Sequence, residues 1–497
     1  MSPELQKQIS KLKKSEWVNL HGLIDCATTY LASSLELPDL SCDSISFLGR
    51  GTYNTVYKLE FSDNSRLAAS VSNLDEEYFD PEAKRSEIET MKYVRESGLY
   101  PDIPVPKIFA LEANFTNLVC APYVLMELIP GRALADDLRE LTRTQQISYV
   151  KSIARLQASL SKPVPFDQIG SIKVCDGQHV VGPLMTLTQK CLGGPYKSME
   201  DLWRAELEDQ MSDALRKWCN VETDFLAPQY CSPLCTPQMF AELFQLLSSL
   251  IPHFQPPKSY LPLVLHHPDI AFRNILVDES SISSGELKIT GLIDWGGAQI
   301  LPLMFTAKYP DDLRTIGYYP FTRPGWEKNE DWYTVPCDWT AAGDSSQWPI
   351  AYGSGPGSGP GLIDYGPKVH GVISKFYLRA YFNACYAEEM CALHGDTDLA
   401  RATVFRDATY YMKFHEVVCT GWRNWVRHKT WIRETYWRLR TAGHGIGSEG
   451  LITGPNIYTE SVQEPVRDLS VYGEYPVAIV YDEDPMTSEI VPVAYHV

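Results

Sequence analysis

Residues 263–278 read LVLHHPDIAFRNILVD, and residues 286–293 read ELKITGLI immediately before Asp294. Both segments contain an apolar, strand-prone run next to polar side chains. If the run after Asn274 pairs with the run before Asp294 as a hairpin, the start of the first strand lies beside the end of the second. Asn274 and Asp294 then meet, and Asp269 lies only five residues upstream of Asn274. Three oxygen-bearing side chains at one sheet edge suit a divalent cation with nucleotide phosphates.

Each of these side chains also has a purely structural explanation, because Asp and Asn are common in turns and at strand ends. A turn does not account for the complete order, which is His267, one residue, Asp269, Asn five residues later, and then strand, turn, strand and Asp294. We therefore interpret the group as functional.

This order resembles two motifs of the aminoglycoside phosphotransferase-like branch of the protein-kinase-like superfamily, particularly a fungal set related to altered-inheritance-of-mitochondria proteins. His267-x-Asp269 with Asn274 is similar to the catalytic loop of that family, and Ile293-Asp294-Trp295 is similar to its metal-binding motif. The resemblance implies that Asp269 accepts or orients the proton of the attacking hydroxyl. It also implies that Asn274 and Asp294 hold Mg²⁺ against the triphosphate of ATP.

The implied fold class is α+β, a bilobal protein-kinase-like fold with a small β-rich N-lobe and a large, mainly helical C-lobe. The expected parts are an N-terminal helical extension (1–44), a nucleotide-binding N-lobe (45–129), a C-lobe (130–445) with an insertion at 302–366, and a C-terminal tail (446–497). Helices are predicted over residues 15–35, 81–97, 143–161, 198–217, 372–393 and 400–440.

A glycine hairpin is predicted at residues 46–61, which read SFLGRGTYNTVYKLEF. Gly49 and Gly51 permit close backbone approach to phosphates, whereas Asn54 stands where protein kinases carry a third glycine. Backbone groups from Met126 to Leu128 are expected to meet the adenine. The residues that the resemblance assigns to the nucleotide are Gly49, Gly51, Asn54, Val56, Glu87, Met126, Glu127 and Leu128.

One expected charge is missing from the third strand. Kinase-like enzymes carry a Lys there, which holds the phosphates and is positioned by a helix Glu. The strand reads LAASVS at residues 67–72, so Ser70 occupies the Lys position and Glu87 is expected to lack its usual partner. Glu87 is then equally well explained as an exposed helix residue. The candidates for a substitute cation are Arg50, Lys58 and Arg66.

Composition narrows the classes of partner. The formal net charge of −18 disfavours nucleic acid and anionic membrane surfaces, and no apolar run reaches the roughly 18 residues of a spanning helix. The 12 cysteines form no metal-site pattern, so we expect reduced thiols and a cytoplasmic location, with a mitochondrial one as the alternative.

Two functions follow from these observations. The first is an ATP- and Mg²⁺-dependent small-molecule kinase that phosphorylates a hydroxyl group. The alternative, suggested by Ser70, is a catalytically impaired pseudoenzyme that binds nucleotide and acts as a scaffold for a protein partner. A protein kinase is disfavoured because Asp294 is followed by Trp-Gly rather than Phe-Gly.

Overall fold

The computed structural model describes residues 3–134, 141–219, 235–306, 308–313, 366–394, 404–441, 479–483 and 490–494. The chain packs into two compact units. The first comprises Met1–Glu140, Arg155–Glu206 and Pro262–Thr306, and the second comprises Leu141–Ala154, Leu207–Leu261 and Ala307–Val497. All residues predicted to bind nucleotide or metal, or to act in catalysis, belong to the first unit.

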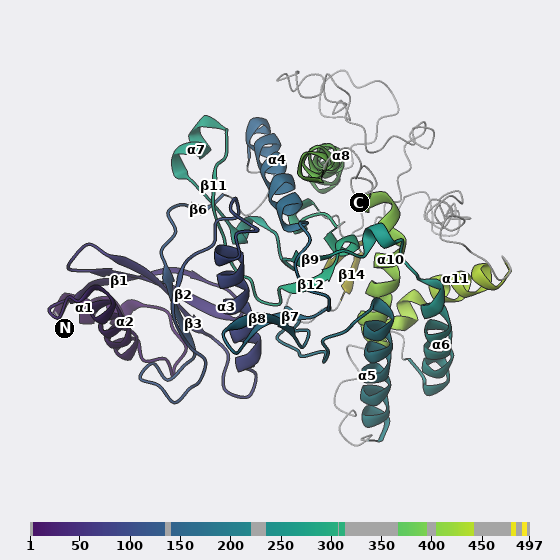
Figure 1. The fold of residues 1–497 in the computed structure, drawn as a ribbon, viewed down its shortest axis with the longest axis horizontal. Coiled ribbons are helices and arrows are strands. Elements are labelled where there is room, and N and C mark those ends of the chain that lie inside the picture. Colours follow the sequence, from purple (N-terminus) through teal and green to yellow (C-terminus); the bar gives the residue numbers. More distant parts are fainter. Residues whose placement is uncertain are drawn as a thin grey trace. The chain divides into compact units, whose positions relative to one another are not determined.

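The first unit contains an antiparallel sheet of five strands in the order β1-β2-β3-β5-β4, of which β1, β2 and β3 are labelled in Figure 1. Its strands are β1 (Cys42–Arg50), β2 (Asn54–Phe61), β3 (Arg66–Ser72), β4 (Ile108–Glu112) and β5 (Tyr123–Glu127). The predicted hairpin at 46–61 and the predicted strand at 66–72 are confirmed.

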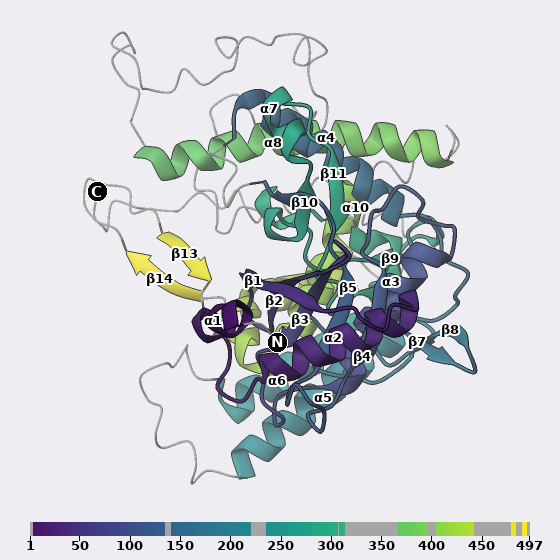
Figure 2. The same ribbon diagram turned by 90° about the vertical axis from the view of Figure 1, so that its left-hand side faces the viewer.

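The two faces of this sheet differ because side chains alternate along each strand. Tyr57, Leu59 and Phe61 of β2 are buried on one face, together with Ala69 and Val71 of β3. Helices α1 (Pro3–Lys11) and α2 (Leu20–Leu35) cover this face, and Figure 2 shows them in front of the strands. The opposite face is therefore the one that remains for a nucleotide.

Helix α3 (Pro81–Glu96) begins as the sequence predicts. Asp80 accepts hydrogen bonds from the backbone amides of Glu82 and Ala83, and Pro81 occupies the first turn, where its missing N–H costs nothing. The helix packs against β4 and against a hairpin of β7 (Ser171–Cys175) and β8 (Gln178–Gly182).

The predicted pairing around the catalytic loop is also confirmed. Strands β10 (Ile275–Val277) and β11 (Ile289–Leu292) pair antiparallel, with Ile275 opposite Leu292. The short strand β6 (Arg132–Ala133) extends this sheet, while β9 (Leu263–His266) pairs with β12 (Gln299–Pro302). Between β10 and β11 the structure forms a short helix, α7 (Glu279–Ser284), where the sequence predicted only a turn. Asp278 caps its start and Gly285, at φ 81°, ends it.

The second unit is mainly helical, as predicted for this part of the chain. Its helices include α6 (Pro237–Leu250), α8 (Gly366–His394), α10 (Val404–Cys419), η11 (Trp422–His428) and α11 (Lys429–Thr441). Helix α4 (Arg143–Leu160) begins in this unit and α5 (Met199–Cys219) ends in it. Stacked rings form its core, with Phe254 and Phe414 at a centroid distance of 4.0 Å.

The prediction of one helix over 400–440 was wrong. The chain breaks between Cys419 and Trp422, because Gly421 has φ 90°, a conformation that L side chains rarely adopt. Most of the predicted insertion at 302–366 lies outside the described residues. In the predicted tail, strands β13 (Ile479–Glu483) and β14 (Ile490–Ala494) pair antiparallel.

Candidate active site

The loop that joins β9 to β10 holds Asp269 through hydrogen bonds to both of its carboxylate oxygens. Asn274 Nδ2 donates to Asp269 Oδ2 at 2.8 Å and also to its backbone carbonyl at 2.9 Å. Arg273 Nη2 donates to Asp269 Oδ1 at 2.5 Å. Asp269 and Asn274 are buried, whereas the Arg273 side chain is 61% exposed. The carboxylate is thus held in one orientation at the edge of the site.

His267 connects this loop to the segment that carries Asp294. Its Nδ1 accepts the Asp269 amide at 3.2 Å, so Nε2 carries the proton and donates to the Ile293 carbonyl at 3.3 Å. The imidazole also meets the ring of Trp295 edge-on at 4.7 Å. The Ile293 amide donates to the Asn274 carbonyl at 2.9 Å, so the predicted meeting of the two loops is confirmed.

Asp294 has two properties that are typical of a functional carboxylate. Its φ of 62° is uncommon for a residue other than glycine, and such backbone strain clusters at functional sites. Desolvation by the surrounding protein atoms, followed by the negative charge of Glu87, raises the pKa of the Asp294 carboxyl to about 6, although the residue as a whole is exposed to solvent. The positive charge of Lys84 partly opposes this shift.

The donor set around Asp294 fits Mg²⁺. Asn274 uses its amide nitrogen to hold Asp269, which leaves its amide oxygen for a metal ion. Within the described ranges, no group of three or more His, Cys, Asp or Glu residues has a metal-binding arrangement. Two protein oxygens, one from Asn274 and one from Asp294, would suit Mg²⁺, which commonly takes its remaining ligands from phosphates and water.

The pKa of Asp294 predicts an unusual effect of Asp294→Asn on stability. An acid whose pKa rises from 3.8 to about 6 on folding binds more protons when folded, so its contribution to stability falls as pH rises through that window. A full shift would correspond to about 3 kcal/mol at pH 7.5, but Asp294 is exposed, so solvent screening reduces the cost of its charge to about 1 kcal/mol. Asn keeps the shape and tolerates positive φ. Denaturant unfolding without Mg²⁺ should show the variant to be more stable than wild type at pH 7.5.

The stability gain should disappear below about pH 4, where the wild-type carboxyl is protonated in both states. Asp278→Asn is the control, because hydrogen bonds from Ser280 lower the pKa of this half-buried helix-capping residue. That variant should show no gain at pH 7.5. A less stable Asp294→Asn protein would contradict the expected cost of the Asp294 charge.

The glycine hairpin between β1 and β2 is built to approach another group closely. Gly49 lies opposite Val56, and the Gly51 amide donates to the Asn54 carbonyl at 2.8 Å. A Cβ on Gly49 would meet nothing within 4 Å, and one on Gly51 only the Asn54 oxygen at 3.9 Å. Neither glycine has a positive φ. Packing and backbone conformation do not require these glycines, so the space beside them is open to an approaching group.

Two residues that the sequence did not single out support this hairpin. Asn73 Nδ2 donates to the Gly51 carbonyl at 2.9 Å, and its Oδ1 accepts from the Thr55 hydroxyl at 2.6 Å. At the tip, burial and then the charge of Asp294 raise the pKa of Tyr53. The tip of the hairpin therefore lies near the Asp294 carboxylate.

The predicted adenine contacts remain predictions, with one restriction. Val56, Ser70 and Val124 lie opposite one another on the uncovered face of the sheet, and Met126 lies two residues further along β5. The backbone amide of Glu127 donates to the Lys107 carbonyl at 2.8 Å, and its carboxylate binds Arg95. The Glu127 amide is thus already in use, and the carbonyl of Glu127 and the groups of Leu128 remain.

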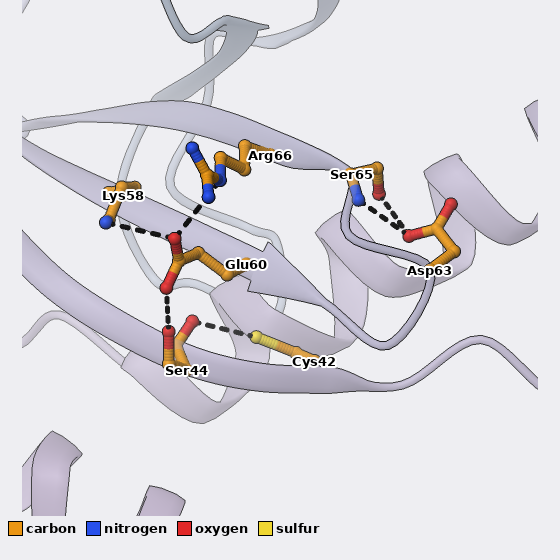
Figure 3. A network of polar contacts seen from close by, with 7 residues as sticks. All are labelled: Cys42, Ser44, Lys58, Glu60, Asp63, Ser65 and Arg66. Atoms are coloured by element: carbon orange, nitrogen blue, oxygen red, sulfur yellow. Dashed lines mark hydrogen bonds and ion pairs between the residues drawn. The ribbon is translucent and has the colours of Figure 1, made fainter.

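The three basic residues proposed as substitutes for the strand lysine do not reach this site. Arg50 lies opposite Thr55, on the face of the sheet that α1 and α2 cover. Lys58 and Arg66 both bind Glu60, at 3.1 and 3.2 Å (Figure 3).

Glu87 lacks its usual lysine partner on β3, as expected, but the alternative of an exposed helix residue was wrong, because Glu87 has a partner on its own helix. Lys84 Nζ lies 2.9 Å from Glu87 Oε2, and their side chains are only 5% and 16% exposed. Both residues belong to α3, where side chains three residues apart share a face. The spacing of Lys84 and Glu87 in the sequence could have revealed this pair.

Comparison with known proteins agrees with this geometry. The model of the phosphotransferase enzyme family matches residues 44–305, more than half of the chain. The protein therefore belongs to this family, and its fold is the α+β, kinase-like fold of aminoglycoside phosphotransferases.

Curated relatives are distant. A subtelomeric hrmA-associated cluster protein of Aspergillus fumigatus is 26% identical over 327 residues, which are 54% of this chain and 60% of that protein. Altered inheritance of mitochondria protein 9 of Debaryomyces hansenii is 29% identical over 145 residues, 28% of this chain and 22% of that protein. The chain thus matches about three fifths of the first relative's length and less of the second.

Solved structures are similar to this chain at low identity. A GDP complex of wild-type aminoglycoside 2′-phosphotransferase-IIIa has a TM-score of 0.34 and 13% identity, over 83% of this chain and 95% of that one. Macrolide 2′-phosphotransferase MphH of Brachybacterium faecium has a TM-score of 0.31 and 13% identity, over 77% and 98%. In the part of the chain that the structure describes, no helix is long and apolar enough to cross a membrane.

Proposed function

We propose that the protein transfers the γ-phosphoryl group of ATP to a hydroxyl group of a small molecule, with Mg²⁺ as the cofactor. One observation carries this proposal. Asp269, Asn274 and Asp294 form one connected site, in which Asn274 binds Asp269 directly and the Asn274 carbonyl accepts the Ile293 amide next to Asp294. The glycine hairpin with open space at Gly49 adds a place for the phosphates.

The residues of the site divide the chemistry among them. The fixed carboxylate of Asp269 orients the acceptor hydroxyl and takes its proton as the oxygen attacks phosphorus. Asn274 and Asp294 would hold Mg²⁺, which neutralises phosphate charge when bound. Amides of the glycine hairpin donate to phosphate oxygens. ADP leaves with the β–γ bridging oxygen as the phosphoryl group passes to the acceptor.

A scaffold without catalytic activity is the second candidate, because Ser70 is neutral and only 7% exposed at the position of the usual lysine. Nucleotide binding without turnover would distinguish it from an enzyme.

The test is nucleotide binding followed by turnover. Calorimetry with ATP or GTP should show binding that requires Mg²⁺. ADP release should then be measured over neutral, anionic and cationic hydroxyl compounds, including aminoglycosides, and at least one should stimulate it. Absence of Mg²⁺-dependent nucleotide binding would sink the proposed function. Binding with no turnover on any acceptor would select the scaffold.

A further inference from the structure

The cation that kinase-like sites need is absent from β3. Ser70 lies on the nucleotide face, opposite Val56 and Val124, and cannot supply a charge. Arg50 lies on the other face, while Lys58 and Arg66 are bound to Glu60 (Figure 3). The question is therefore which other basic side chain reaches the metal-binding carboxylate.

Lys84 of α3 is in the right place. Its Nζ binds Glu87 Oε2 at 2.9 Å. A Cβ built on Gly296 would lie 3.8 Å from that same Glu87 oxygen and 3.5 Å from Asp294 Oδ1. The two carboxylates thus flank Gly296, and the ammonium of Lys84 lies beside them. Its charge acts on Asp294.

The burial of Lys84 separates it from an ordinary helix ion pair. Lys92 and Glu89 form a pair of the same spacing on the same helix, at 2.7 Å, but the Lys92 side chain is 37% exposed and that of Lys84 only 5%. Burying an ammonium is costly unless it is paired, and a surface pair contributes little. A purely structural pair has no need of this burial.

The helix that carries Lys84 is firmly placed. Glu89 of α3 lies 3.5 Å from His179 of the β7–β8 hairpin, and Tyr93 packs against Phe166 and His179. Such support fixes the position of Lys84 before a ligand binds, which a catalytic charge requires.

We propose that Lys84 replaces the missing strand lysine and binds the phosphates of the nucleotide, with Glu87 as its positioning residue. This assignment rests on the proposed function, because it needs a nucleotide in the site. The charge comes from the helix instead of the strand, and Ser70 then fills the place that a lysine side chain would occupy.

The first test uses the unmodified full-length protein. An ATP acyl phosphate acylates a lysine amine that lies against the phosphates, and peptide mapping identifies that lysine. Label is expected on Lys84 and should be blocked by excess Mg²⁺–ATP. Protected label on Lys58 instead of Lys84 would overturn the assignment.

The second test uses Lys84→Met, which removes the charge but keeps the apolar stem. Affinity for Mg²⁺–ATP should fall about 10- to 10²-fold, the size of a lost charge-assisted hydrogen bond, while affinity for adenosine should not change. Lys92→Met is the matched control and should bind both like wild type. Adding Ser70→Lys to Lys84→Met should restore part of the ATP affinity, because it returns a cation to the strand.

The outcomes separate this assignment from the proposed function. Wild-type protein that binds no Mg²⁺–ATP would overturn both. Wild-type binding with equal losses for ATP and adenosine in Lys84→Met, or with no loss, would overturn only the role of Lys84. If Lys84→Met does not fold, the labelling experiment decides alone.

Discussion

Replacing Asp269 by Asn is expected to lower kcat for phosphoryl transfer on the order of 10²- to 10⁴-fold, the usual size of a general-base contribution. An amide keeps the shape but cannot accept the proton of the attacking hydroxyl. ATP affinity should stay within a few-fold of wild type, because Asn274 and Asp294 hold the metal side of the site. The measurement is steady-state ADP release at saturating ATP, with calorimetry for the nucleotide.

The split between kcat and affinity is the informative result. Asp176→Asn, in the exposed turn of the β7–β8 hairpin, is a matched control and should retain wild-type kcat. Thermal unfolding should show that both variants fold. A kcat for Asp269→Asn within threefold of wild type would exclude Asp269 as the base.

Trp295→Ala is expected to reduce the unfolding free energy by about 3–5 kcal/mol, the usual cost of deleting a buried large aromatic. Trp295 is fully buried, its indole Nε1 donates to the Leu292 carbonyl at 3.0 Å, and His267 packs against its ring at 4.7 Å. Denaturant titration monitored by far-UV circular dichroism measures the loss. Because the ring supports His267, ADP release should fall as well.

Two further variants separate packing from hydrogen bonding. Trp295→Phe keeps a ring against His267 and should lose less than Trp295→Ala. Trp17→Ala, with a side chain that is 43% exposed in the same unit, should lose far less than either. Equal losses for Trp17→Ala and Trp295→Ala would mean that burial does not determine the cost.

Much of the site could be predicted because its elements are close together in the sequence. The strands around Asn274 and Asp294 are next to each other in sequence, so their pairing followed from apolar runs and one intervening turn. The glycine hairpin and α3 are local in the same way. Cap residues such as Asp80 mark where such elements begin.

The features that the sequence did not reveal depend on three-dimensional structure: the face of the sheet on which a side chain lies, its burial, and the backbone conformation. Arg50 was a candidate until the register placed it opposite Thr55, on the covered face. Lys84 was passed over because the known lysine position is on a strand, and burial cannot be seen in an isolated helix pattern. Gly421 interrupts a regular apolar stripe through its backbone conformation alone. The raised pKa of Asp294 likewise comes from desolvation in the folded chain and then from the charge of Glu87, which is distant in sequence.

Lys84 and Glu87 lie on the same helix, α3, so their ion pair cannot indicate whether that helix is in place. Where the lysine lies on a strand and the glutamate on a helix, displacement of the helix breaks the pair, and the contact serves as a gauge of an assembled site. Here a rigid movement of α3 would carry both charges away together and leave the pair intact. The distance that would report an assembled site in this protein is instead the one between Glu87 and Gly296. It joins α3 to the loop that carries Asp294.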